Sequence, residues 1–409
     1  MSYRNILPGS TIGILGGGQL GRMMALAGKA MGYRFVTLDP SENCSCSQVA
    51  DDHIITEYKD AKGANQLASK SQVITYEFEN VDAEIVENLE KLSYVPQGSL
   101  LLKITQNRIM EKRIMQSFGL PIAPFEIINR DPFEMVNVDP TSHMKLVATS
   151  SVTRMEAILM KAIDTLGMPL IMKTATGGYD GKGQWIIRNE RDYFTASQVF
   201  SQPEYANIDF IVEKFIDFER EISVVVARSS RGDIEAFPVA ENKHVNNILH
   251  MSIVPARIPT SAQEKAKEIA SDIAEQLDVV GVLAIEMFYQ ADGNIYINEL
   301  APRPHNSGHY TMDACETSQF EQHIRAICNL PLGNTTLLTP VVMVNLLGQH
   351  IQPFMELLPE LPKQVKFHLY GKQGIVHNRK MGHINVVAED VEQALTIIKT
   401  KLAFIENLL

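Results

Sequence analysis

The stretch Asn298-Glu-Leu-Ala-Pro-Arg-Pro-His-Asn-Ser-Gly-His309 decides the fold of the C-terminal half of this chain, because its first residues end a predicted hairpin. Two apolar runs typical of β-strands flank Asp292-Gly293, a pair that favours a two-residue turn. Counting back from such a turn places Glu286 directly opposite Glu299. The sequence therefore predicts two carboxylates that face each other across an otherwise apolar hairpin.

Two carboxylates at facing positions repel each other, because cross-strand neighbours have Cβ atoms about 5 Å apart. A cation between Glu286 and Glu299 would remove that repulsion. Mg²⁺ suits the position, since it usually takes one or two carboxylates and leaves its other ligand positions to water and substrate phosphates. A surface pair tolerated by solvent is the alternative interpretation. The dense polar run 303–309 that follows the hairpin favours the metal site.

The whole chain has the composition of a soluble globular protein, with 45% hydrophobic and 21% charged residues. At 409 residues it is too long for one ordinary domain, so two or three are expected. No apolar run reaches the length of a membrane span, and residues 1–8 lack the apolar core of a signal peptide, so we expect a cytoplasmic protein. The net charge of −11 argues against nucleic acid as a partner. An anionic ligand would need a local basic pocket.

The first hundred residues alternate strands and helices, which predicts a doubly wound parallel sheet. Gly16-Gly-Gly-Gln-Leu-Gly21 lies between the first strand and the first helix, and Asp39 ends the next strand. This spacing matches the dinucleotide-binding pattern and would indicate an NAD-dependent oxidoreductase. The pattern alone specifies only a tight turn and a helix N-terminus open to an anion. The rest of the chain indicates different chemistry.

A second glycine-rich loop follows Lys173, in the run Lys173-Thr-Ala-Thr-Gly-Gly-Tyr-Asp-Gly-Lys-Gly-Gln184. Lysine at the end of an apolar strand can reach nucleotide phosphates, and the glycines let backbone N–H groups fold over an anion. The run is not a Walker sequence, because no Gly-Lys-Ser/Thr is present. A plain glycine-rich hairpin is the alternative. Residues 210–216 then read as a strand whose backbone could pair with an adenine edge, and Glu221 opens the strand after it.

The order of these parts resembles the ATP-grasp superfamily: a lysine before a glycine loop, a Glu-Lys-aliphatic strand, and two glutamates on a later hairpin. Three runs, Gly17–Met23, Gly177–Gln184 and Asn298–His309, are similar to one family within it, the 5-(carboxyamino)imidazole ribonucleotide synthases of purine biosynthesis. Many ATP-grasp enzymes place an Asn metal ligand two residues after the hairpin Glu. Here that position is Ala301, which fits this family and counts against carboxylases of the biotin type.

The resemblance implies an α/β (α+β) ATP-grasp fold in three parts. These are an N-terminal doubly wound parallel-sheet (pre-ATP-grasp) domain at 1–108, an ATP-grasp domain at 109–332 and a small C-terminal domain at 333–409. Residues 131–155 depart from the family pattern and read as an inserted loop. The implied partners are ATP, bicarbonate and 5-aminoimidazole ribonucleotide, with Mg²⁺ as cofactor and a homodimer as the assembly.

The resemblance also implies a role for individual residues. Those it gives to ATP are Arg108, Lys173, Gly178, Tyr179, Asp180, Gly181, Lys182, Gly183, Gln184, Glu213, Lys214, Phe215, Ile216, Glu221, His244, Asn298 and Glu299. The metal would lie on Glu286 and Glu299. The candidate catalytic residues, around bicarbonate and the ribonucleotide, are Tyr179, Asp180, Arg303, His305 and Asn306. The candidate ribonucleotide-binding residues are Gln19, Leu20, Glu77, Lys372, Arg379 and Lys380.

The last group includes a basic loop, Lys372 with Arg379 and Lys380, in an acidic protein. Convergent cations and a bidentate donor suit the 5′-phosphate of a ribonucleotide, although a solvated charge run is the plainer interpretation. Three other functions stay open. The chain could be a different ATP-grasp ligase, such as a formate-dependent glycinamide ribonucleotide transformylase, an NAD-dependent oxidoreductase, or a nucleotide-binding module without catalysis.

Overall fold

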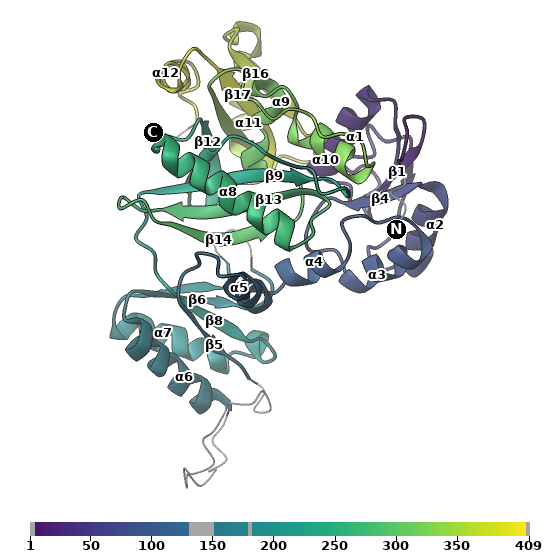
Figure 1. Ribbon diagram of the computed structural model, residues 1–409. Coiled ribbons are helices and arrows are strands. Elements are labelled where there is room, and N and C mark those ends of the chain that lie inside the picture. The colour runs from purple at the N-terminus through teal and green to yellow at the C-terminus, as the bar shows by residue number, and fades with distance from the viewer. Residues whose placement is uncertain (1–4, 131–150, 179–181, 406–409) are drawn as a thin grey trace. The chain divides into compact units, whose positions relative to one another are not determined.

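The computed structural model describes residues 5–130, 151–178 and 182–405, without the side chains of residues 151–153 (Figure 1). The chain folds into two compact units. The first consists of residues 1–105 and 219–409, and the second of residues 106–218. Among the described residues no helix has the length and apolar character needed to span a membrane.

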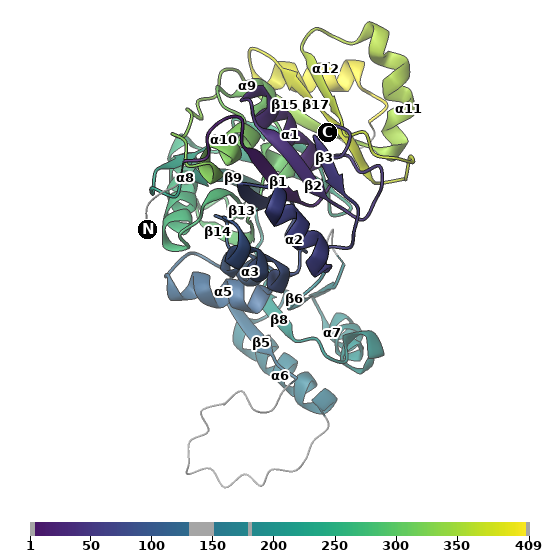
Figure 2. The same cartoon turned by 90° about the vertical axis from the view of Figure 1, so that its right-hand side faces the viewer.

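The first unit begins with a four-stranded parallel sheet in the order β3-β2-β1-β4. Figure 2 labels three of these strands, β1, β2 and β3. Its strands are β1 (Thr11–Leu15), β2 (Arg34–Leu38), β3 (Asp52–Ile54) and β4 (Val73–Tyr76). The alternation of strands and helices that the sequence predicted for this region is confirmed. Strand β3 was not predicted, because a strand of three residues is too short to show the alternation of apolar and polar residues that identifies strands.

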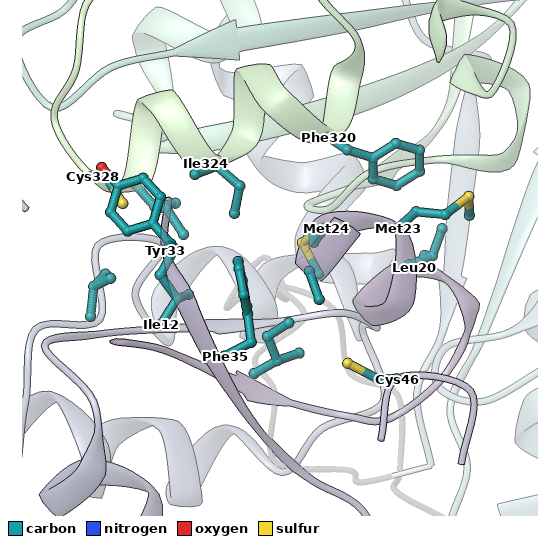
Figure 3. Close-up of a cluster of buried hydrophobic side chains, with 14 of the residues drawn as sticks. Ile12, Leu20, Met23, Met24, Tyr33, Phe35, Cys46, Phe320, Ile324 and Cys328 are labelled. Carbon is teal, nitrogen blue, oxygen red and sulfur yellow. The ribbon is translucent and has the colours of Figure 1, made fainter. Parts of the chain in front are cut away.

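Helices cover both faces of this sheet. Helix α1 (Gln19–Ala30) packs on one face together with α10 (Gln319–Ile327), which comes from the C-terminal half of the chain. Their shared core, shown in Figure 3, includes Phe35, Met24 and Ile324, each fully buried. Helices α2 (Ala61–Lys70) and α3 (Ala83–Leu92) bury a second cluster against the same sheet, and α4 (Leu100–Thr105) follows. The N-terminal sheet is thus fixed within the first unit by a helix distant in sequence.

The rest of the first unit is built on a nine-stranded sheet whose pairings are all antiparallel, in the order β14-β13-β9-β11-β12-β15-β17-β16, with β10 paired to β9. Its strands are β9 (Arg220–Arg228), β10 (Ile234–Ala236), β11 (Ala240–Val245), β12 (Ile248–Val254), β13 (Gly281–Tyr289), β14 (Ile295–Ala301), β15 (Val341–Leu347), β16 (Val365–Leu369) and β17 (Lys380–Val387). Because β12 pairs with β15, the segment expected as a small C-terminal domain continues this sheet.

Helix α8 (Thr260–Gln276) packs against β9 and β10, and α11 (Gly348–Leu357) and α12 (Val391–Lys401) pack against β15 and β17. The short helices η3 (Asn306–Gly308), α9 (Thr311–Ala314) and η4 (Leu358–Glu360) complete the unit. The hairpin of β13 and β14 lies at one edge of the sheet, and β17 lies next to the opposite edge.

The second unit is a four-stranded antiparallel sheet in the order β5-β8-β6-β7. Its elements are α5 (Arg108–Ser117), β5 (Phe125–Ile128), α6 (Ser151–Leu166), β6 (Leu170–Thr174), β7 (Gln184–Ile187), α7 (Glu190–Gln198), η1 (Val199–Ser201), η2 (Pro203–Tyr205) and β8 (Phe210–Lys214). The inserted loop was expected to reach residue 155, but α6 begins at Ser151, because Met155, Leu159 and Ala162 are buried at helical spacing. Residues 131–150 lie outside the described part of the chain.

Candidate active site

The β13–β14 hairpin confirms that Glu286 pairs with Glu299, although the predicted two-residue turn was wrong. The backbone N–H of Gln290 donates to the carbonyl of Asn294, and Gly293 adopts a positive φ of 88°, so the loop has three residues. A longer loop would shift the register by one residue. A bulge at Asn298 restores it, because Met287 pairs with Ile297 while Glu286 still pairs with Glu299.

The two carboxylates meet at one edge of the large sheet, with imidazoles nearby. Burial and the charge of Glu299 raise the pKa of Glu286. The Oε1 atom of Glu286 lies 3.5 Å from Nε2 of His305. Glu221 forms an ion pair with Nδ1 of His244, and although burial opposes protonation, the charge of Glu221 raises the pKa of His244.

This donor set fits a hard divalent cation that also binds phosphate. Repulsion between Glu286 and Glu299 is the strain that a cation would relieve. Among the described residues, no group of three or more His, Cys, Asp or Glu side chains could hold a metal on its own. A pair of carboxylates that leaves further ligand positions to water and substrate is the arrangement typical of Mg²⁺.

The candidate catalytic residues Arg303, His305 and Asn306 follow β14 in a tightly held turn. Arg303 is paired with Glu79, a partner that the sequence analysis missed. The side chain of Gln319 on α10 accepts a hydrogen bond from the backbone N–H of His305 at 2.9 Å and donates to its carbonyl at 2.8 Å. This part of the chain is therefore positioned by helix α10, which nothing in the local sequence indicates.

Asn306 has both polar atoms of its side-chain amide buried and without a hydrogen-bond partner among the described residues. Such a group costs about 1–3 kcal/mol when it stays unpaired. A buried amide of this kind is expected to bind a ligand. Asn306 is thus the candidate catalytic residue that the geometry supports most directly.

The N-terminal glycine loop binds the protein's own carboxylates. Both carboxylate oxygens of the buried Glu77 accept hydrogen bonds from backbone amides, one from Gly18 and one from Gly21. Asp39 accepts from the Gly17 amide at 2.9 Å and from the Tyr58 hydroxyl at 2.5 Å. A side chain at position 16, 17 or 18 would clash with these acids. The glycines therefore let two acids approach the loop, whose amides are occupied, and the dinucleotide interpretation loses its support.

The basic loop between β16 and β17 lies beside this glycine loop within the first unit. The side chain of Gln48 donates to the carbonyl of Gly371 at 2.7 Å and accepts from Arg22 at 3.0 Å. Burial, with a smaller contribution from Arg379, lowers the pKa of Lys372 to about 8. Glu77 interacts electrostatically with Lys372. The candidate ribonucleotide-binding residues from the two ends of the chain are thus brought together.

Three further candidate ribonucleotide-binding residues, Gln19, Leu20 and Lys380, differ in how they could contact a ligand. Leu20 is buried in the core against α10, so only its backbone could contact a ligand, while Gln19 is half-buried. Lys380, expected on the ribonucleotide phosphate, influences the pKa of Glu286 and His305 as well as that of Lys372. Arg22 and Gln48 are polar contacts that sequence analysis missed, because their importance depends on the approach of the distant basic loop.

In the second unit, Lys173 belongs to a buried ion triad. Its Nζ lies 3.1 Å from Oε1 of Glu213, and Nζ of Lys112 lies 3.5 Å from Oε2 of the same carboxylate. Lys112 and Glu213 are 1% and 3% exposed. Although burial opposes ionisation, the charges of Lys112 and Lys173 lower the pKa of Glu213. The triad carries one net positive charge, and its third member, Lys112, had no sequence signal.

Arg108 holds the start of the second glycine loop. Its guanidinium donates to the carbonyls of Thr174 at 3.0 Å, Gly177 at 2.6 Å and Gly178 at 3.4 Å. The two arms of the loop approach closely, since a side chain at Gly178 would lie 2.5 Å from the carbonyl of Lys182. Lys182 is exposed, and Gly183 and Gln184 lead into β7. The expected residues Tyr179, Asp180 and Gly181 lie outside the described residues.

Strand β8 corrects the expectation that residues 210–216 form one strand with a free backbone edge. It ends at Lys214 and is central, since β5 and β6 pair with it on either side. The amides of Lys214 and Phe215 donate to the carbonyls of Pro124 and Pro169. The Glu213 side chain is held by two lysines, and Phe215 and Ile216, which follow the strand, are half-buried.

Comparison with known proteins agrees with this architecture. Family models match residues 9–106 (ribonucleotide synthetase preATP-grasp domain), 141–320 (ATP-grasp domain) and 341–396 (phosphoribosylaminoimidazole carboxylase C-terminal domain). The fold and the carboxylate hairpin thus define an ATP-grasp ligase.

A Bacillus subtilis relative named N5-carboxyaminoimidazole ribonucleotide synthase is 46% identical over 401 residues, covering 98% of this chain and 97% of that protein. The chain belongs to the N5-carboxyaminoimidazole ribonucleotide synthase family. An N5-carboxyaminoimidazole ribonucleotide synthetase solved as its ADP complex is 51% identical, with a TM-score of 0.88 and 98% of each chain covered. The Aspergillus clavatus enzyme with ADP and 5-aminoimidazole ribonucleotide is 27% identical, with a TM-score of 0.83, covering 98% of this chain and 99% of that one.

Proposed function

We propose that this protein uses ATP and bicarbonate to carboxylate the exocyclic amine of 5-aminoimidazole ribonucleotide. The products are 5-(carboxyamino)imidazole ribonucleotide, ADP and phosphate, in de novo purine biosynthesis. One observation carries the proposal: on the family's fold, the Glu286–Glu299 pair adjoins His305, and the next residue, Asn306, has a buried amide without a hydrogen-bond partner among the described residues. Such a site can bind a metal-bound phosphate on one side and a small polar acid on the other.

The first step would join bicarbonate to the γ-phosphoryl group of ATP. A bicarbonate oxygen attacks phosphorus, the bond to ADP breaks, and carboxyphosphate forms. Mg²⁺, held by Glu286 and Glu299, would neutralise charge on the phosphate oxygens. The protein's own contribution is positioning and charge stabilisation. We assign the ATP phosphates to Lys173, which forms an ion pair with Glu213, and to the second glycine loop, whose Gly177 carbonyl accepts a hydrogen bond from Arg108.

The second step would transfer the carboxyl group. The ribonucleotide amine attacks the carboxyl carbon of carboxyphosphate, phosphate leaves with the bonding electrons, and the amine loses a proton. We place the 5′-phosphate of the ribonucleotide against Lys372 and Arg379, since a dianionic phosphate needs convergent cations. Glu77, which interacts electrostatically with Lys372, would lie near the rest of the ribonucleotide. Asn306 would donate to a carboxyl oxygen through its amide, and His305 would lie next to it.

The substrate requirement tests this function. ADP release should depend on the simultaneous presence of bicarbonate and 5-aminoimidazole ribonucleotide, with no change in nicotinamide absorbance. ADP formation that needs formate and glycinamide ribonucleotide would identify a different ATP-grasp ligase and overturn the proposal. We also propose a cytoplasmic homodimer, supported by the family resemblance. Sedimentation of the purified chain as a stable monomer at micromolar concentration would contradict the dimer.

A further inference from the structure

A row of buried polar side chains crosses the large sheet and ends at His305. In order along the row, the hydroxyl of Ser252 contacts Asn242 Oδ1 at 2.8 Å, Asn242 Nδ2 contacts Ser223 Oγ at 2.9 Å, and Ser223 Oγ contacts Ser307 Oγ at 2.8 Å. Ser307 Oγ then lies 2.9 Å from Nδ1 of His305. These four supporting side chains are at most 6% exposed.

The strand register explains why these residues meet. Ser223 on β9 pairs with Glu286 on β13, and Asn242 on β11 pairs with Ser252 on β12. Paired residues project from the same face of a sheet. The polar row therefore lies on the face that also carries the metal-site carboxylate. Polar groups with so little access to water persist only when each is hydrogen-bonded, so the row forms a continuous chain of bonds.

The direction of these hydrogen bonds follows from one backbone group. The N–H of Ser307 is directed at Nδ1 of His305, at 3.4 Å, and a backbone N–H can only donate. Nδ1 is therefore an acceptor. The Ser307 hydroxyl must donate to Nδ1, so its oxygen accepts from Ser223. Ser223 in turn accepts from the Asn242 amide, which leaves Asn242 Oδ1 to accept from Ser252.

We propose that the chain Ser252–Asn242–Ser223–Ser307 holds His305 as the neutral tautomer whose proton lies on Nε2. The ring then presents an N–H donor on the side where Glu286 lies, 3.5 Å away. In this state Nε2 has no lone pair for a metal or for proton abstraction. His305 is a hydrogen-bond donor, and the four supporting residues are positioning residues.

The consequence for the reaction rests on the proposed function. A fixed N–H donor beside the metal-site carboxylate can stabilise negative charge on an oxygen of bicarbonate or carboxyphosphate. A histidine in the opposite tautomer would offer a lone pair and act as a base. Bicarbonate already carries a nucleophilic oxygen, so a donor that orients it is the more useful group at this position.

Nitrogen NMR of the ligand-free chain tests the tautomer directly. In protein labelled with ¹⁵N-histidine, two-bond proton–nitrogen spectra separate the two neutral tautomers from imidazolium, and His305→Asn identifies the signal. At pH 7.5 we expect the pattern of a protonated Nε2 and an unprotonated Nδ1. An Nδ1–H tautomer or an imidazolium would overturn the proposal. The spectrum does not depend on activity. If it is as expected and the chain still fails to use bicarbonate, the proposed function fails and the tautomer assignment stands.

Variants test the positioning chain. Ser307→Ala removes the hydroxyl donor at 2.9 Å and leaves Nδ1 only the longer backbone N–H contact at 3.4 Å. The preference for the Nε2–H tautomer should therefore weaken, so we expect signals of both tautomers in the spectrum. We also expect kcat to be reduced threefold to tenfold, with KM for ATP within twofold of wild type. Ser307→Thr, which keeps the hydroxyl, should recover most of the kcat. The control is Ser229→Ala, which removes another fully buried hydroxyl, bonded to Asp233 at 3.0 Å. Its kcat should match wild type. A single Nε2–H pattern with unchanged kcat in Ser307→Ala would overturn the role of the chain.

Discussion

The carboxylate of Glu213 lies 3.1 Å from the ammonium of Lys173 in an almost fully buried position, and a second lysine, Lys112, neutralises it from the other side. A carboxylate shared by two lysines leaves one positive charge in the triad. Lys173 is the more exposed lysine, with 13% of its side chain accessible, so we propose that a phosphate binds there. Glu213 therefore positions the two lysines, although the family resemblance assigned it to contact with ATP.

Glu213→Gln should destabilise the second unit strongly, because the buried Lys112 and the half-buried Lys173 lose the carboxylate that they share. Breaking a buried pair costs about 3 kcal/mol or more, which for a unit of this size corresponds to a decrease in Tm of roughly 10 °C. The double variant Lys112→Met/Glu213→Gln should recover at least half of that decrease, since only the more exposed lysine then stays unpaired. Thermal unfolding followed by circular dichroism measures both. A double variant no more stable than Glu213→Gln would contradict the triad.

Glu286→Gln and Glu299→Gln should each abolish ligation and leave the fold intact. Each removes one of two anionic ligands, so the Mg²⁺ concentration for half-maximal activity should rise about tenfold or more in any variant with residual activity. In EDTA the Tm of either variant should equal or exceed that of wild type, because repulsion between the carboxylates is relieved. Full activity at low Mg²⁺ would remove these residues from the metal site.

Arg379→Ala should raise KM for 5-aminoimidazole ribonucleotide about tenfold or more, because a guanidinium is the bidentate partner best suited to a phosphate. KM for ATP should stay near the wild-type value. Initial rates with each substrate varied in turn provide the measurement, and Lys366→Ala, an exposed lysine on β16, serves as the control. Equal losses for both substrates, or for neither, would place the basic loop outside the ribonucleotide site.

Binding of the ribonucleotide should weaken as the pH rises through about 8, the pKa to which burial lowers Lys372. Below that pH the ammonium is charged and attracts the 5′-phosphate, and above it the amine is neutral. The value of kcat/KM for the ribonucleotide reports ionisations of the free enzyme, so it should fall between pH 7.5 and 9. Lys372→Arg keeps its charge and should give a flat profile over that range. A wild-type profile that is flat to pH 9 would contradict this role of Lys372.

Sequence reasoning succeeded where short-range patterns determine structure. The N-terminal strands followed from their periodicity, and the pairing of Glu286 with Glu299 followed from counting along a hairpin. That count gave the correct pair only because a three-residue loop and the bulge at Asn298 compensate for each other. A bulge depends on pairing with the neighbouring strand, so local sequence gave no sign of it.

The missed contacts all depend on tertiary structure. Lys112 reads as an ordinary helical lysine until the fold places it against Glu213, and Gln48 gains its role only when the basic loop approaches. At the N-terminal glycine loop the sequence pattern indicated a ligand that the structure does not support. A dinucleotide-like glycine pattern can also arise where an acidic side chain such as Glu77 accepts hydrogen bonds from the backbone amides. The spacing of the glycines predicts only that some group lies close to the loop backbone. Whether that group is a ligand phosphate or a side chain of the protein depends on the tertiary fold.

The central claim is that bicarbonate is activated through carboxyphosphate, and oxygen-isotope transfer tests it most directly. With [¹⁸O]bicarbonate, ATP and 5-aminoimidazole ribonucleotide, the bond that breaks in the second step leaves one bicarbonate oxygen on the phosphate. We therefore expect one ¹⁸O atom in each phosphate released, seen by ³¹P NMR, together with the remaining label in the carbamate of the product. Phosphate without ¹⁸O, formed while the ribonucleotide is carboxylated, would contradict the account.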